Sequence, residues 1–292
     1  MKLSMDFYEY SERFGDYKGA EMVKEAGFDA IDYSFFYMKE KQEVLGENYR
    51  EYAQTFRAHL DAIGLECNQA HAPFGYEYGM EGAEEEKHFT FLARSIEAAS
   101  ILGAKIIVVH AIRTPRGVDF DAFNLEFYNR LLPICEKFGI LLGVENLFNT
   151  DRRRNCYFHQ RFGKADHLNR FMEMLNSPWA VVCVDLGHAA LTGNEPQEFI
   201  EDIKPQYLKA LHVHDNDYLK DRHRLPYLGE MDWDAIIKAL KKSGYQGDLT
   251  MELISMEFPS YAQRLPDALI PAALRFAAEV GRHLIEEFEK EE

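Results

Sequence analysis

Metal-capable side chains end six short β-rich runs that follow one another along this chain. They are His71, His110, Glu145, Asp185, His212 with His214 close by, and Glu252, while His188 follows Asp185 by three residues. Imidazoles and carboxylates are the usual protein ligands of divalent metals. Burying so many of them together without a cation would cost several kcal/mol for each unpaired ion. The pattern therefore predicts a divalent metal site.

The ligand set that we predict is Glu145, Asp185, His212 and Glu252. Three carboxylates and one imidazole make a site rich in oxygen, which suits manganese, magnesium or cobalt and is also accepted by zinc. One such ion would leave coordination positions for two neighbouring substrate oxygens, and so would polarise a carbonyl and stabilise an enediolate. This chemistry isomerises sugars.

The chemistry depends on strands that bring these residues to one place. Short β-rich runs alternate with longer amphipathic runs, which indicates βα units and a parallel sheet. The predicted strands are 2–6, 30–34, 66–70, 105–110, 140–146, 180–186, 208–214 and 248–253. Eight units without a glycine-rich phosphate fingerprint favour a closed (β/α)₈ TIM barrel over a doubly wound sheet, and predict no nucleotide cofactor. Functional residues then lie at the carboxyl ends of the strands.

Composition and charge narrow the class of protein. No linker divides the chain, so we expect one domain over residues 1–292, with a C-terminal helical extension from about residue 259. The net charge of −16 disfavours nucleic acid and acidic membranes as partners. We expect a cytoplasmic location, since no signal peptide or run of roughly 20 apolar residues is present. A small molecule is the expected partner, and assembly into a homo-oligomer is left open.

Five motifs carry a family resemblance that covers nearly the whole chain. They are Val144-Glu145-Asn146, Val184-Asp185-Leu186-Gly187-His188, the run from Leu211 to Asp217, Asp221-Arg222-His223 followed by Leu228-Gly229-Glu230, and Met251-Glu252. In order and spacing they resemble the xylose-isomerase-like barrel superfamily. This superfamily joins sugar and sugar-phosphate isomerases and epimerases to the endonuclease IV-like enzymes.

The resemblance implies roles for single residues. Glu145 and Glu252 would bind the metal and also form the acid/base pair that exchanges the substrate proton. His188 would hold a substrate hydroxyl or carbonyl oxygen. His212 is favoured over His214 as the ligand because the family's histidine stands three residues before an acidic residue, as His212 does before Asp215. His71, His110, Asp221 and His223 are predicted to line the substrate site.

Two other functions share the same residue pattern. Endonuclease IV-like phosphodiesterases bind three zinc ions with extra histidines and an Asp-x-His, and His71, His110, His188, Asp221 and His223 stand at comparable places. The strong negative charge argues against binding of duplex DNA.

The second alternative function is that of a metal-dependent dehydratase for cyclic polyols or keto acids. In such an enzyme the same cation stabilises an enolate, which then expels a hydroxyl.

A basic run follows the fifth predicted strand. Arg152, Arg153 and Arg154 stand together in an otherwise acidic chain, on the expected functional side of the barrel. Arginine binds phosphate and carboxylate bidentately, so Arg153 is a candidate contact for an anionic group of the substrate. A solvated loop or a subunit contact explains the same run equally well.

Overall fold

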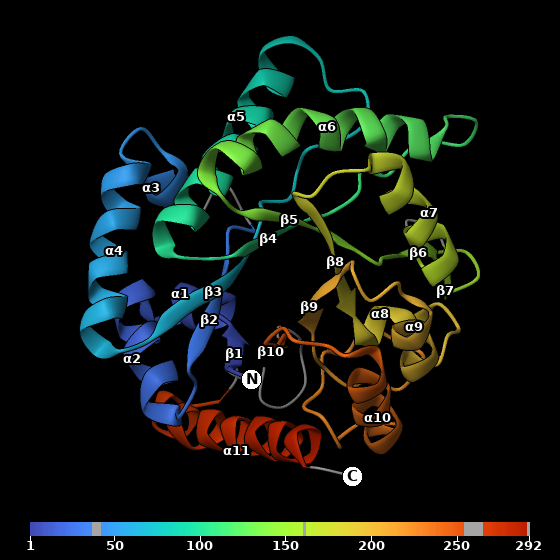
Figure 1. Cartoon of the computed structure of the whole chain (residues 1–292). Coiled ribbons are helices and arrows are strands. Elements are labelled where there is room, and N and C mark those ends of the chain that lie inside the picture. Colours follow the sequence, from blue (N-terminus) through green and yellow to red (C-terminus); the bar gives the residue numbers. More distant parts are fainter. Residues whose placement is uncertain (37–41, 160–161, 254–264, 291–292) are drawn as a thin grey trace.

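Eight parallel strands form the centre of the molecule, surrounded by helices (Figure 1). The computed structural model describes residues 1–36, 42–159, 162–253 and 265–290. The strands are β1 (Leu3–Asp6), β2 (Ala30–Ser34), β3 (Glu66–His71), β4 (Ile106–Val109), β5 (Leu141–Glu145), β8 (Ala180–Asp185), β9 (Leu208–His212) and β10 (Leu249–Met251). They neighbour one another in the order β10-β1-β2-β3-β4-β5-β8-β9. The predicted (β/α)₈ barrel is confirmed.

The barrel closes between β9 and β10 through a single residue just past β9. The amide of Val213 donates to the carbonyl of Thr250 at 2.8 Å, and the amide of Glu252 donates to the carbonyl of Val213 at 3.1 Å. These two bonds fix the register at the seam. As a result His212, at the end of β9, and Glu252, just past β10, lie side by side.

The strands are apolar because they are covered on both sides. All six residues of β8, Ala180–Asp185, are buried, as expected for a parallel strand between a packed barrel interior and a layer of helices. The strands are shorter than predicted at several ends. His110, His214 and Glu252 lie just beyond β4, β9 and β10, in the first residues of the following loops.

At least one helix follows each barrel strand and packs outside it. The helices are α1 (Tyr8–Phe14), α2 (Asp16–Ala26), α3 (Gln42–Leu45), α4 (Tyr49–Ile63), α5 (Gly82–Leu102), α6 (Phe120–Phe138), α7 (Ala165–Leu175), α8 (Leu186–Leu191), α9 (Pro196–Asp202), α10 (Trp233–Ser243) and α11 (Ile270–Glu289). The short helices α1 and α8 begin within two residues of the ends of β1 and β8. Among the described residues, no helix is both long and apolar enough to cross a membrane.

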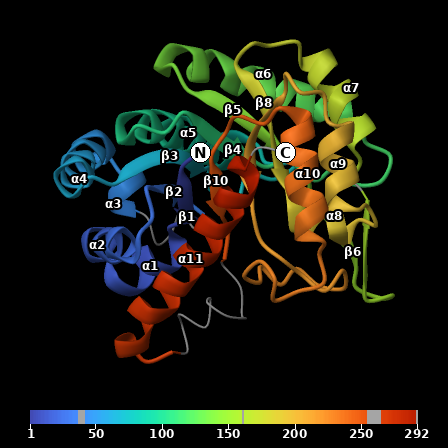
Figure 2. The same cartoon turned by 60° about the horizontal axis from the view of Figure 1, so that its bottom comes forward.

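Helix α11 covers β1 and β10 from outside (Figures 1 and 2). It packs against α2, α10 and β1, and so takes the place of the helix that follows the eighth strand. Of the segment that we expected as an extension, residues 259–264 lie outside the described residues. The short 3₁₀ helix Asp267–Leu269 then leads into α11.

A two-stranded hairpin replaces the plain loop that the sequence suggested after the fifth barrel strand. Strands β6 (Phe148–Asp151) and β7 (Cys156–His159) pair antiparallel, and Asp151 fixes the turn by accepting the amides of Arg153 and Arg154. Figure 2 shows the hairpin extending from the same end of the barrel as the loop between β9 and α10. The basic run therefore lies at the hairpin tip.

Candidate functional site

The four predicted ligands meet at the carboxyl ends of β5, β8, β9 and β10. Nδ1 of His212 lies 3.4 Å from Oε1 of Glu145, 3.5 Å from Oε2 of Glu252 and 4.0 Å from Oδ2 of Asp185. All four side chains are buried. Three carboxylates that approach one imidazole nitrogen from separate strands can hold one ion among them.

His212 is oriented by a carboxylate behind it. Its Nε2 lies 3.4 Å from Oδ2 of Asp32, which also accepts a 2.7 Å hydrogen bond from Nε2 of Gln69. A carboxylate on one imidazole nitrogen favours the proton there and leaves the other nitrogen free to bind a cation. Asp32 therefore aims Nδ1 of His212 at Glu145, Asp185 and Glu252.

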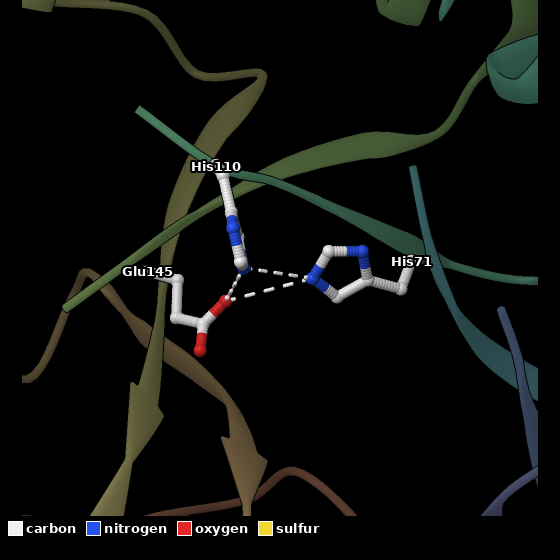
Figure 3. Close-up of side chains that lie close together, drawn as sticks. All are labelled: His71, His110 and Glu145. Atoms are coloured by element: carbon white, nitrogen blue, oxygen red, sulfur yellow. Dashed lines mark hydrogen bonds and ion pairs between the residues drawn. The ribbon is translucent and has the colours of Figure 1, made fainter. Parts of the chain in front are cut away.

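His71, His110 and Glu145 form a second group beside the first (Figure 3). The two Nε2 atoms are 3.0 Å apart, and Oε2 of Glu145 lies 2.8 Å from Nε2 of His110 and 3.6 Å from Nε2 of His71. Nδ1 of His71 donates to the carbonyl of Ala72 at 2.8 Å. That bond places the proton of His71 on Nδ1 and leaves its Nε2 unprotonated, next to Nε2 of His110 and Oε2 of Glu145.

His188, Asp221 and His223 form a third group. Nε2 of His223 lies 3.2 Å from one oxygen of Asp221, and Nε2 of His188 lies 3.8 Å from the other. Both imidazoles donate from Nδ1 to a backbone carbonyl, His188 to Asn146 at 3.0 Å and His223 to Glu252 at 2.9 Å. Carbonyl acceptors thus orient these histidines as Ala72 orients His71.

His214 supports the site from behind Asp185. Its Nε2 lies 3.1 Å from both carboxylate oxygens of Asp185, and its ring stacks on His223 with centroids 3.9 Å apart. The ring rests on Gly187, where a Cβ atom would overlap the imidazole. His214 therefore positions Asp185, while His212 faces Glu145 and Glu252.

The electrostatics of the cluster show an excess of negative charge. Burial and then the nearby Asp185 and Glu145 raise the pKa of Glu252 well above its ordinary value, although His212 and His223 oppose this. Burial lowers the pKa of His223, but Asp221 and Glu252 outweigh it and raise the pKa to about 10. A divalent cation would neutralise this excess, so the residues present fit a metal ion.

Glu145 has the opposite shift. Burial raises its pKa, but the imidazoles of His110 and His212 outweigh burial and hold the pKa well below the ordinary value. Glu145 belongs to two overlapping ligand groups, with His71 and His110 in one and with Asp185 and His188 in the other. It can therefore bridge these two parts of the site.

Arg153 lies apart from these groups. It is exposed at the tip of the β6–β7 hairpin, where its backbone amide donates to Asp151 at 2.9 Å. The structure brings Glu145, Asp185, His188, His212, His71, His110, Asp221, His223 and Glu252 together and leaves Arg153 at the rim.

Known proteins share the sequence pattern and the fold of this chain. The family described as "Xylose isomerase-like TIM barrel" matches residues 20–280. The chain belongs to this family. Its sequence relatives include the uncharacterized protein y4fM of Sinorhizobium fredii, 27% identical over 267 residues that cover 80% of this chain and 79% of the relative. An inosose dehydratase of Clostridium botulinum is 24% identical over 214 residues, covering 64% and 68%.

Solved structures share the fold of this xylose isomerase-like barrel. A D-psicose 3-epimerase crystallised in the presence of D-fructose superposes with a TM-score of 0.75 and 20% identity, over 98% of this chain and 99% of the epimerase. The IolI protein with a bound zinc atom gives a TM-score of 0.75 and 16% identity over the full length of both chains. At these identities the likeness shows the fold.

Sequence reasoning missed two residues that organise the site of this xylose isomerase-like protein. Asp32 lies within β2, whereas the candidate residues indicated by the sequence all close strands from the third onward. Asn146 exchanges two hydrogen bonds of 2.8 Å with the backbone of Asp185 through its side-chain amide. A carboxylate or amide inside an otherwise apolar strand was the available signal, because such a group needs a partner when buried.

Proposed function

We propose that this protein is a metal-dependent sugar isomerase or epimerase in which Glu145 and Glu252 are the acid/base pair. The observation that carries the proposal is that both carboxylates, from strands that are not neighbours in the sheet, lie within 3.5 Å of the same nitrogen of His212. Two carboxylates at one ion can act on one sugar carbon from two directions.

A divalent ion held by Glu145, Asp185, His212 and Glu252 would polarise the carbonyl of a bound sugar and favour loss of the neighbouring proton as an enediolate. One glutamate removes this proton from carbon. Epimerisation requires its return to the opposite face, which the second glutamate provides, whereas isomerisation returns a proton to the neighbouring carbon. His188, beside both Glu145 and Asp221, is placed to hold a hydroxyl or carbonyl oxygen of the sugar.

The relatives support this reading. A sugar epimerase shares the fold over almost the whole chain, and a zinc atom is bound in the structure of IolI. We propose one divalent ion, manganese, zinc, magnesium or cobalt, since carboxylates with a single imidazole accept all four. The substrate is a small sugar or sugar phosphate.

The test is a screen of ketoses and ketose phosphates in deuterated water with the metal-loaded protein. Turnover with deuterium at the carbon beside the carbonyl is expected. Glu145→Gln and Glu252→Gln should each lower turnover about 10²- to 10⁴-fold, the usual contribution of a general acid or base. Glu136→Gln, on the exposed face of α6, is the matched control and should leave turnover unchanged. Product without solvent deuterium would contradict proton transfer.

A phosphodiesterase is the second candidate, and the three adjoining ligand groups favour it. His71 with His110, and His188 with Asp221 and His223, each add imidazoles beside the four central ligands. Imidazole suits zinc, so a site for several zinc ions fits these residues as well. Three zinc ions per chain and cleavage of an abasic DNA duplex would favour this candidate. The net charge of −16 argues against duplex DNA as the substrate.

A dehydratase is the third candidate, because an inosose dehydratase is among the sequence relatives. The same residues would remove a proton beside a carbonyl and then release a hydroxyl from the next carbon. Loss of water from the product, detected by mass spectrometry in the same screen, distinguishes a dehydratase from an isomerase.

A further inference from the structure

Three cavities meet at one arginine in the loops after β4 and β5. Arg113 lines a cavity of about 660 Å³ together with His110, Tyr76 and Phe74. It also lines a cavity of about 700 Å³ with Arg116 and one of about 370 Å³ with Arg152 and Arg153. Because His110 belongs to the group with His71 and Glu145, the first cavity leads from Arg113 to the candidate metal site.

Four arginines that line these cavities have no carboxylate partner among the described residues. Over the described ranges, Arg113, Arg116, Arg152 and Arg153 form no ion pair. Arginines elsewhere are commonly held by carboxylates: Arg50 pairs with Glu97, Arg130 with Glu85 and Arg282 with Asp29. The chain has 49 acidic and 33 basic residues, so carboxylates are abundant as possible partners for arginine. A group of arginines without such partners among the described residues therefore indicates a binding site for an anionic ligand.

The acidic groups that face these cavities do not neutralise the arginines. Asp151 lines the smallest cavity, but its Oδ1 accepts the amides of Arg153 and Arg154, and its Oδ2 lies 3.7 Å from Nε of Arg154. Glu77 lines only the first cavity and is exposed. Arg113 therefore faces space that is open to an anion.

Arg113 stands on a rigid part of its loop. The buried side chain of Asn124 accepts a 2.7 Å hydrogen bond from the amide of Ile112 and donates a 3.0 Å bond to the carbonyl of the same residue. Both the amide and the carbonyl of Ile112, the residue before Arg113, are thus held by hydrogen bonds. The side chains of Arg113, Arg152 and Arg153 are all exposed, but the backbone beside Arg113 is held by these two bonds, whereas Arg152 and Arg153 lie in the turn of the hairpin.

We propose that Arg113, assisted by Arg116, Arg152 and Arg153, binds a phosphate or carboxylate group of a sugar substrate. The proposal deepens the proposed function and rests on it for the placement of the sugar carbonyl at the metal site. A cavity of about 660 Å³ lies within the range of roughly 300–1,000 Å³ that small-molecule sites occupy. The guanidinium fork would bind two oxygens of the anion at once.

The test measures binding to metal-free protein in a chelating buffer, by calorimetry, with D-fructose 6-phosphate, D-fructuronate and uncharged D-fructose as probes. Arg113→Ala should weaken binding of the anionic sugars about tenfold or more, as expected for loss of a charge-assisted pair of hydrogen bonds. Binding of D-fructose should stay the same. Whichever anionic sugar depends more on Arg113 identifies phosphate or carboxylate as the natural group.

Arg275→Ala is the matched control, because Arg275 is exposed on α11 and also forms no ion pair within the described chain. It should change each dissociation constant by less than about twofold. Arg113→Lys, which keeps the charge without the fork, should fall between wild type and Arg113→Ala. Equal effects of Arg113→Ala and Arg275→Ala, or equal weakening of charged and uncharged sugars by Arg113→Ala, would overturn the proposal.

These outcomes are independent of turnover. If the protein neither isomerises nor epimerises any sugar, yet loses anion affinity in Arg113→Ala, the anion site stands and the proposed function fails. If uncharged ketoses are turned over and anionic sugars bind no better than uncharged ones, the proposed function stands and the anion site fails.

Discussion

Asp32 orients His212 at the candidate metal site without belonging to the proposed ligand set. It lies against Nε2 of His212 and leaves Nδ1 toward the carboxylates. We predict that Asp32→Asn lowers the affinity for the divalent ion about 10- to 100-fold, the usual effect of removing a group that orients a ligand. Competition with a fluorescent chelator measures this. Asp61→Asn removes an exposed carboxylate of α4 and should leave the affinity unchanged; the same affinity in both variants would contradict the role of Asp32.

Asp6 gives a prediction for pH dependence. Burial and the charge of Asp32 raise its pKa to about 7, although a hydrogen bond from Ser34 opposes the shift. The folded state therefore holds the proton more tightly than the unfolded state. The stability that Asp6 contributes is present below its unfolded pKa and is lost as the pH rises toward 7.

Urea unfolding of metal-free wild type and Asp6→Asn at several pH values tests this. The variant has no proton to lose, so the free energy of unfolding of wild type, relative to the variant, should fall between about pH 4 and pH 7. A difference that stays constant across this range would show that Asp6 keeps an ordinary pKa in the folded protein.

The site residues that could be predicted from the sequence are those at which a metal-binding residue type stands at the end of a predicted strand. Glu145, Asp185, His212 and Glu252 each follow an apolar run, and a barrel gathers such positions at one mouth. Asp32 and Asn146 act on a ligand, so their importance depends on distances that no spacing along the chain encodes. That no described carboxylate pairs with Arg113 is likewise a property of the folded chain, because it depends on which carboxylates come near.

At the scale of the elements, α11 is seated by a glycine. Gly281 faces β1 and β10, where an added Cβ would clash with the side chain of Leu3 and lie 3.0 Å from Sδ of Met251. We predict that Gly281→Ala destabilises the protein by about 1–3 kcal/mol through overpacking, although alanine is the better helix former by about 1 kcal/mol. Chemical denaturation measures the change, with Arg275→Ala on the same helix as a neutral control. Stabilisation of Gly281→Ala would mean that α11 is not closely packed on the strands.

The barrel strands could be predicted more readily than the parts attached to them. Runs such as Val181–Val184 are apolar throughout because helices and barrel interior cover both faces, and this leaves a clear pattern. The β6–β7 hairpin has no such apolar pattern in the sequence, because its short strands carry polar residues and its turn consists of the polar residues Arg152 to Asn155. Several observed strand ends differ from the predicted ones by a residue or two. A strand ends where its hydrogen bonding to the neighbouring strand ends, and composition does not encode that position.

At the scale of the whole molecule, the number of bound ions separates the proposed functions. The central ligands Glu145, Asp185, His212 and Glu252 suffice for one ion, whereas the two histidine groups beside them would be filled only in a site for several ions. We predict one tightly held divalent ion per chain, counted by elemental analysis after dialysis. Three zinc ions per chain would favour the phosphodiesterase instead.

Removal of the ion by a chelator should lower the melting temperature by several degrees. An ion that binds only the folded state stabilises that state, by about 2.7 kcal/mol when its concentration is a hundred times its dissociation constant. The carboxylates and His212 must lose protons to bind the ion, so this difference in melting temperature should shrink as the pH falls. A chelated protein that melts at the same temperature as the metal-loaded protein at neutral pH would show that no ion is held by these residues.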